Sequence, residues 1–124
     1  VHPASADSIP TCENTEDHVS MGTIGARQAL QIAENVEKIM AIAVMTGFYA
    51  LSMRLKQFEE MKMDHIPEKV LSPASLDFYY AIKKSNKAFE NGNFIRTDRF
   101  LAPEIEAIRR HFNDFQVVAE KYIQ

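Results

Sequence analysis

Acidic residues, a histidine and the single cysteine crowd into one short stretch near the start of the chain. The stretch reads S-I-P-T-C-E-N-T-E-D-H-V-S-M-G-T-I-G from Ser8 to Gly25, and three acids, one histidine and the cysteine lie between residues 12 and 18. Carboxylates and imidazoles can bind metal ions or move protons. Carboxylates also favour the positive end of a helix that follows them. The stretch therefore admits three interpretations: a metal site, a charged helix entry, or an active-site segment.

The spacing within this cluster leaves the three interpretations open. Glu13, Glu16, Asp17 and His18 offer oxygen and nitrogen ligands, but they match no spacing that specifies a metal. As a helix entry, each acid would contribute roughly 0.3–1 kcal/mol, and Asp17 would be the candidate N-cap. As an active-site segment, a carboxylate at the start of a helix could bind a cation or transfer a proton. Cys12 is expected to be an inert small residue, because the sequence around it predicts no activated thiol.

The composition predicts one ordinary globular domain. The chain has 124 residues, of which 46% are hydrophobic and 25% charged, and its net charge is −3. This balance gives no reason to expect nucleic acid or a membrane as a partner. A single cysteine forms no internal disulfide, which indicates a reducing, cytoplasmic setting. No signal peptide is predicted, and the start at Val1 suggests a piece of a longer protein.

A long helix is expected to follow the loop of residues 1–18. Residues 19–63 contain no proline and are rich in helix-forming residues. An apolar stripe at spacings of three and four comprises Ile32, Val36, Ile39, Met40 and Ala43. From Ile39 to Leu51 the polar face disappears, so this part of the helix must be enclosed on all sides. The fifteen uncharged residues 39–53 are fewer than the roughly 20 that span a bilayer, so the sequence predicts a buried helix.

The length of this helix carries a further expectation. About forty helical residues make a rod of about 60 Å. A compact globule of this chain length would have a diameter of only about 35 Å. The remaining residues cannot wrap such a rod, so the helix is expected to be a bundle and interface element that packs against other chains or other parts of a longer protein.

Residues 64–124 predict a connector and two shorter amphipathic helices. Ser72 and Pro73 offer an N-cap followed by proline at the first helical position, and this helix is expected to end near Asn91. The next helix begins at Pro103 with a single apolar stripe formed by Ile105, Ile108, Phe112, Phe115, Ala119 and Tyr122. No alternating pattern predicts a strand. The predicted fold class is therefore all-α, with one long central helix plus two shorter amphipathic helices.

Two segments carry a resemblance to a known enzyme family. The segment H-P-A-S-A-D-S-I-P-T-C-E-N-T-E-D-H-V-S-M, from His2 to Met21, resembles the C-terminal active-site segment of histidine ammonia-lyases, which belong to the aromatic amino acid lyases. The segment T-D-R-F-L-A-P-E-I-E, from Thr97 to Glu106, resembles a D-R-F-x-A-P-x-I-E stretch near the C-terminus of the same enzymes. The long helix lies where the family has its central-bundle helix. The resemblance favours the active-site interpretation and a piece of a larger helical-bundle enzyme.

The resemblance implies a definite activity. Family members are largely helical homotetramers that eliminate ammonia from an aromatic amino acid, giving urocanate when the substrate is histidine. Their electrophile is a 4-methylidene-imidazol-5-one (MIO) group, which forms autocatalytically from an internal Ala-Ser-Gly. By this resemblance Glu16 falls on the active-site glutamate, with a role in binding the imidazole or in handling a proton. Asn14 and His18 fall on supporting positions of the substrate pocket, and no metal is implied.

Departures from the family pattern limit what this chain can do alone. Thr15 stands where many relatives have Gln, and Cys12 where Ser is common. The sequence contains no Ala-Ser-Gly, and the family's tyrosine base matches no tyrosine here. The expectation is a C-terminal fragment of a cytoplasmic, oligomeric histidine ammonia-lyase-like enzyme that is inactive by itself. A lyase for tyrosine or phenylalanine, an aminomutase and a non-catalytic helical association module remain as alternatives.

Overall fold

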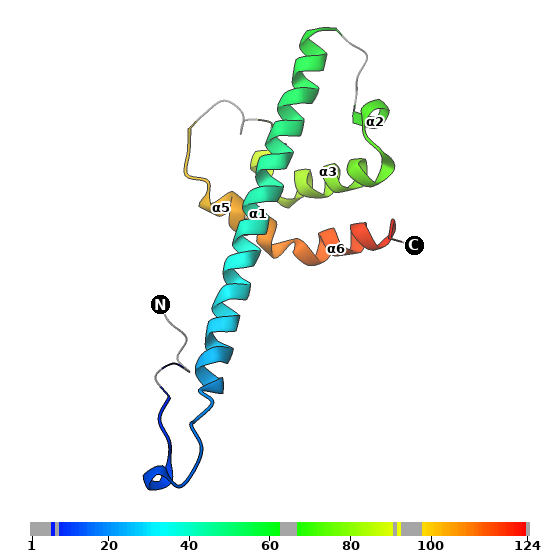
Figure 1. Ribbon diagram of the computed structural model, residues 1–124. Helices are drawn as coiled ribbons and strands as arrows, with labels where there is room; N and C mark the ends of the chain where they lie inside the picture. Colours follow the sequence, from blue (N-terminus) through cyan, green and yellow to red (C-terminus); the bar gives the residue numbers. More distant parts are fainter. Residues whose placement is uncertain (1–5, 7, 63–66, 91, 93–97, 124) are drawn as a thin grey trace. The chain divides into compact units, whose positions relative to one another are not determined.

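Helices make up nearly all the regular structure in the computed structural model of this chain (Figure 1). The structure describes residues 6, 8–62, 67–90, 92 and 98–123. The elements are η2 (Cys12–Asn14, a single turn), α1 (Gly22–Glu60), α2 (Pro67–Val70), α3 (Pro73–Ser85), α4 (Lys87–Glu90), α5 (Ala102–Arg110) and α6 (Phe112–Glu120). Within these described residues no strand forms, and the β pairing is one isolated antiparallel bridge between Pro10 and His18. The predicted all-α class is confirmed.

The long helix begins later than its sequence predicts. Met21 has a φ of 53°, in the left-handed region, so the right-handed helix starts at Gly22 and not at Val19. The prediction that Asp17 caps this helix is wrong, because Asp17 lies five residues before its first residue. At the other end the helix stops at Glu60, and Lys62 has a left-handed φ of 54°.

The chain divides into two compact units, Val1–Glu37 and Lys38–Gln124. The core lies in the second unit, where α1 supplies one face and the shorter helices supply the rest. Its buried members are each no more than 5% exposed: Ala41, Met45 and Phe48 of α1, Ile82 of α3, Phe89 of α4, Ile108 of α5 and Phe115 of α6. Figure 1 shows α3 (yellow-green) and α6 (orange-red) side by side within this unit.

Aromatic rings hold the elements of the second unit together. The Phe48 ring of α1 lies 5.2 Å from the Tyr79 ring of α3 and 5.3 Å from the Phe89 ring of α4, measured between centroids. The Phe78 and Phe115 rings join α3 to α6 at 5.3 Å. Tilted pairs at such distances contribute about 0.5–1.5 kcal/mol each beyond the area that they bury. The three contacts therefore tie both α1 and α6 to α3 and its neighbour α4.

The apolar stripe predicted on the long helix is not the face that this chain covers. Ile32, Val36, Ile39 and Met40 are between 47% and 64% exposed. The covered face of α1 comprises Ala41, Met45, Phe48, Ser52 and Leu55. The enclosure on all sides expected for residues 39–51 is therefore not supplied by the described residues of this chain. An 18-residue window of α1 has a mean hydropathy of 1.4, enough by length and composition to cross a membrane, although core helices of soluble proteins share these properties.

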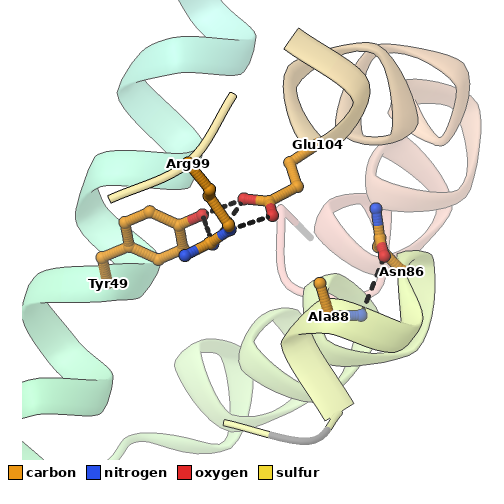
Figure 2. A network of polar contacts seen from close by, with 5 residues as sticks. All are labelled: Tyr49, Asn86, Ala88, Arg99 and Glu104. Carbon is orange, nitrogen blue, oxygen red and sulfur yellow. Dashed lines mark hydrogen bonds and ion pairs between the residues drawn. The ribbon is translucent and has the colours of Figure 1, made fainter. Parts of the chain in front are cut away.

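The first of the two shorter helices is divided at Asn86. Its start is as predicted: Ser72 Oγ accepts a hydrogen bond from the backbone N–H three residues on, at 3.3 Å, and Pro73 opens α3. Asn86 is extended, with φ −153° and ψ 136°, and ends α3. Its Oδ1 then accepts from the N–H of Ala88 at 2.9 Å and caps α4 (Figure 2). The single helix predicted up to residue 91 is thus two helices, and the predicted stop itself lies outside the described residues.

The second shorter helix is divided at His111. This residue has φ −99° and ψ 10°, and its N–H donates to the Ile108 carbonyl at 3.0 Å, a tighter turn than the α-helical one. Its ring Nδ1 lies 2.7 Å from the Ala107 carbonyl oxygen. A side chain that competes for a carbonyl of the preceding turn commonly bends or breaks a helix. The helix predicted from Pro103 onward is therefore α5 followed by α6.

An ion pair with a buried carboxylate joins the segment before α5 to α5 itself, and Tyr49 of α1 hydrogen-bonds to both of its members (Figure 2). Arg99 donates through Nε and Nη2 to the two carboxylate oxygens of Glu104, at 2.7 and 2.8 Å. Its Nη2 also donates to the Tyr49 hydroxyl at 2.9 Å, and that hydroxyl donates to Glu104. We call Tyr49, Arg99 and Glu104 the clamp. Because Arg99 and Glu104 belong to the D-R-F-L-A-P-E-I-E stretch, the clamp gives that stretch a structural role.

The clamp keeps a negative charge inside the protein by surrounding it with donors. Glu104 is only 5% exposed. Burial pushes the pKa of its carboxyl upward, but the hydrogen bonds from Arg99 and Tyr49 and the Arg99 charge outweigh burial, and the pKa lies below its usual value. Burial and the neighbouring carboxylate raise the pKa of the Tyr49 phenol. At neutral pH the clamp therefore holds a charged pair and a neutral tyrosine.

Removing the cation of the clamp should destabilise the fold strongly. Arg99→Met leaves Glu104 buried without its counter-charge, and we expect the free energy of unfolding to fall by about 3–5 kcal/mol. Urea unfolding followed by far-UV circular dichroism measures this loss. Arg110→Met is the matched control, because the Arg110 side chain is 74% exposed and pairs with Glu106 at the surface, so it should change stability by about 0.5 kcal/mol or less. Equal losses in the two variants would contradict this account.

The clamp should also make stability depend on pH on the acidic side. Because the pKa of Glu104 is lowered by folding, the unfolded chain takes up this proton first, and the contribution is present above the usual value of 4.5 and lost as pH falls below it. The difference in unfolding free energy between the unmodified chain and Glu104→Gln should be constant near neutral pH and shrink below that value. A difference that grows on acidification would overturn the prediction.

Candidate active site

The candidate site lies on a hairpin at the N-terminal end of the chain, in the first unit. Pro10 and His18 form the antiparallel bridge, and the Val19 N–H donates to the Ile9 carbonyl at 3.3 Å. The Ser8 hydroxyl donates to the Val19 carbonyl across the same pair of segments. We call residues 8–19 the N-terminal hairpin. It reverses the chain just before α1, so a segment expected to be a simple loop has a defined backbone.

The tip of the hairpin is a turn of unusual hand. Cys12, Glu13 and Asn14 have φ values of 47°, 53° and 68°, so three successive residues other than glycine are left-handed. Asparagine adopts this region more readily than most other residues. For a residue other than glycine, a strained backbone conformation costs of order 1–3 kcal/mol. Such a turn persists only where surrounding contacts hold it, and it is frequent at functional sites. Here the Thr15 N–H donates to the Cys12 carbonyl at 2.9 Å and the Thr15 hydroxyl donates to the same oxygen.

Glu16, the predicted catalytic residue, follows this turn directly. Its N–H donates to the Thr11 carbonyl at 3.3 Å, and its Oε2 accepts from the Thr11 hydroxyl at 3.0 Å. The Glu16 side chain is exposed, so its carboxylate is accessible from solvent in this chain. The arrangement offers an oriented negative group that can bind an ammonium or imidazolium ion, or accept a proton.

The two predicted supporting residues lie on the same hairpin. Asn14 is the last of the left-handed residues, and His18 forms the bridge to Pro10. Both are exposed, and neither hydrogen-bonds Glu16 within the described part of the chain. The structure thus places Glu16, Asn14 and His18 on one short segment. Their roles toward a substrate stay predictions.

The electrostatics of the hairpin favour a cationic ligand. Residues 8–21 carry three acids and no lysine or arginine. An exposed segment of one charge sign raises the local concentration of ions of the opposite sign. Among the described residues, no three His, Cys, Asp or Glu side chains are grouped so that they could hold a metal ion.

Thr11 is the site residue that sequence reasoning missed. It precedes Glu16 by five residues, a separation that brings side chains together in neither a helix nor a strand. Only the left-handed turn between them makes the contact. The strained turn has no signature such as glycine at its positions, so nothing in the residue types predicted it.

Comparison with known proteins covers most of the chain. A family model described as aromatic amino acid lyase matches residues 1–84, which include the N-terminal hairpin and α1 through α2 and most of α3. A histidine ammonia-lyase of Halalkalibacterium halodurans is 37% identical over 113 residues, 91% of this chain and 19% of that protein. One of Symbiobacterium thermophilum is 36% identical over 118 residues, 95% of this chain and 20% of that protein.

A third relative is more similar over a shorter range. The histidine ammonia-lyase of Natranaerobius thermophilus is 62% identical over 53 residues, 43% of this chain and 10% of that protein. The chain thus spans a fifth or less of the length of these curated relatives. No solved structure matches the chain. Since the family model covers more than half of its residues, the chain belongs to the aromatic amino acid lyase family.

Proposed function

We propose that the whole protein to which this chain belongs eliminates ammonia from an aromatic amino acid, with L-histidine as the favoured substrate and urocanate as the product. The observation that carries the proposal is that the family match includes the N-terminal hairpin, where Glu16 is held in an exposed and oriented position. The named relatives are histidine ammonia-lyases, which supports histidine over other aromatic amino acids.

The reaction asks for groups that this hairpin can supply. Loss of ammonia breaks the bond between the α-carbon and nitrogen and removes a proton from the β-carbon, so the site must hold the substrate and handle a proton. The Glu16 carboxylate can accept a hydrogen bond from an imidazole N–H or take up a proton. His18 and Asn14 would line the substrate pocket on the same segment. An acidic hairpin also attracts the ammonium group of an amino acid.

The electrophile of such a reaction is not contributed by this chain. In the family it is the MIO group, which is made from an internal Ala-Ser-Gly and supplies an electrophile for the substrate amine. These 124 residues contain no Ala-Ser-Gly, so they cannot form an MIO group of their own. The part of the chemistry that falls to this chain is confined to the Glu16 carboxylate and the side chains that orient it.

Exposed apolar side chains on α1 support an oligomer. Leu30, Ile32, Ile39 and Met40 of this helix are 54–64% exposed, an arrangement that is costly unless another surface covers it. We therefore include a homo-oligomer, a tetramer by analogy with the family, in the proposal. Neither nucleic acid nor membrane is proposed as a partner, and the single cysteine is consistent with the cytoplasm as the location.

Two other functions are separated from this one by simple measurements. A parent enzyme acting on tyrosine or phenylalanine, or an aminomutase, would differ in substrate or product, which chromatography of the reaction mixture resolves. The exposed apolar side chains of α1 also suit a helical association module without activity. A reading frame upstream that encodes Ala-Ser-Gly would favour the enzyme, whereas a chain that assembles without any such sequence would favour the module.

Neutralising Glu16 should slow the whole enzyme. Glu16→Gln keeps the shape of the side chain and removes its charge, so we expect turnover to fall by about 10² or more. Formation of urocanate from histidine provides the measurement. Glu13→Gln is the matched control, because Glu13 lies on the same exposed turn and is not the residue that Thr11 binds. Unchanged kinetics in the Glu16 variant would reduce it to a residue of the turn before the helix.

The purified 124-residue chain should be inactive on histidine. It lacks the sequence from which the electrophile forms, so no urocanate is expected above the rate of a reaction without protein. Ultraviolet absorbance of urocanate is the assay. Its appearance with this chain alone, at a rate proportional to chain concentration, would refute the proposal that the electrophile comes from elsewhere in the protein.

A further inference from the structure

One side chain fixes the direction of the Glu16 carboxylate. The Thr11 hydroxyl donates to Glu16 Oε2 at 3.0 Å, while the Glu16 N–H donates to the Thr11 carbonyl at 3.3 Å. The two residues are therefore joined through backbone and side chain together. We propose that Thr11 is a positioning residue that orients the Glu16 carboxylate for the elimination, an inference that rests on the function proposed above.

The turn between the two residues serves this contact. Left-handed Cys12, Glu13 and Asn14 fold the chain back within four residues, so that Glu16 arrives beside Thr11. The bridge between Pro10 and His18 closes the hairpin behind them. Thr11 itself is half-buried, whereas Glu16 is exposed. The donor is therefore the less exposed member of the pair, which suits a residue that positions the other.

The contact gives the two oxygens of the Glu16 carboxylate different surroundings. A threonine hydroxyl has one proton to donate, and Thr11 gives it to Oε2. No described residue donates a hydrogen bond to Oε1 of Glu16. Oε2 therefore fixes the orientation of the group, and Oε1 is left to meet the substrate. Holding a reacting group in a productive geometry accounts for large parts of enzymatic rate, because small misplacements slow the chemical step far more than they weaken binding.

The test uses the whole enzyme and two substitutions at the same position. Thr11→Val keeps the branched shape and removes the donor, whereas Thr11→Ser keeps the donor and removes a methyl group. We expect Thr11→Val to lower kcat about 10-fold or more with KM changed by about threefold or less, and Thr11→Ser to restore most of kcat. Equal losses in the valine and serine variants would assign Thr11 a merely structural role and overturn the proposal.

Two further variants separate this inference from the proposed function. Glu13→Gln changes a side chain on the same turn that does not contact Thr11, so it should leave kcat closer to the unmodified value than Thr11→Val does. In a Glu16→Gln background, Thr11→Val should cost little more, because the carboxylate that it orients is already gone. Full activity of Thr11→Val beside an impaired Glu16→Gln would sink the positioning role and leave the function standing. Full activity of Glu16→Gln would also overturn the positioning role, because no carboxylate would need to be oriented, whereas a whole enzyme that forms no urocanate from histidine would overturn the proposed function.

Discussion

The fold of the larger unit depends on a carboxylate that is almost completely buried. Taking Glu104 out of water costs several kcal/mol, and the two parallel hydrogen bonds from Arg99 with a third from Tyr49 offset that cost. The three residues come from α1, from the segment before α5 and from the first turn of α5. The apolar contacts of Phe48 and Ile108 bury surface, whereas the hydrogen bonds of the clamp require a specific geometry among its three residues.

The features that follow from local chemistry could be predicted from the sequence. Helix-forming residues and the absence of an alternating pattern predicted an all-α chain, and Ser72-Pro73 predicted where α3 begins. The stripe of Ile105, Ile108, Phe112, Phe115, Ala119 and Tyr122 predicted the inner side of the last region in part: Ile108 and Phe115 are buried, whereas Ala119 and Tyr122 are exposed. The breaks at Asn86 and His111 escaped prediction, because each arises from a side chain that bonds to a neighbouring backbone group. A periodic apolar pattern in the sequence continues across such breaks and does not reveal them.

The candidate site likewise combines residues that could be predicted with one that could not. The family resemblance singled out Glu16, Asn14 and His18, and the structure places all three on one hairpin. The residue that holds Glu16 could not be predicted, since its contact depends on a turn of left-handed residues that no glycine marks. The long helix gave a third kind of miss. Its repeating stripe was visible, but which side of α1 the chain itself covers depends on helices far along the sequence.

The sequence separation of the clamp has a kinetic consequence. Tyr49 is 50 residues from Arg99 and 55 from Glu104, so these contacts can form only after a long loop has closed. Helices α1, α3 and α6 can take shape locally before that, on a much shorter timescale. Interactions that are absent from the folding transition state slow the escape from the native state and leave the folding rate nearly unchanged. We therefore expect the clamp to form after the local helices, and its loss to speed unfolding of this unit more than it slows folding.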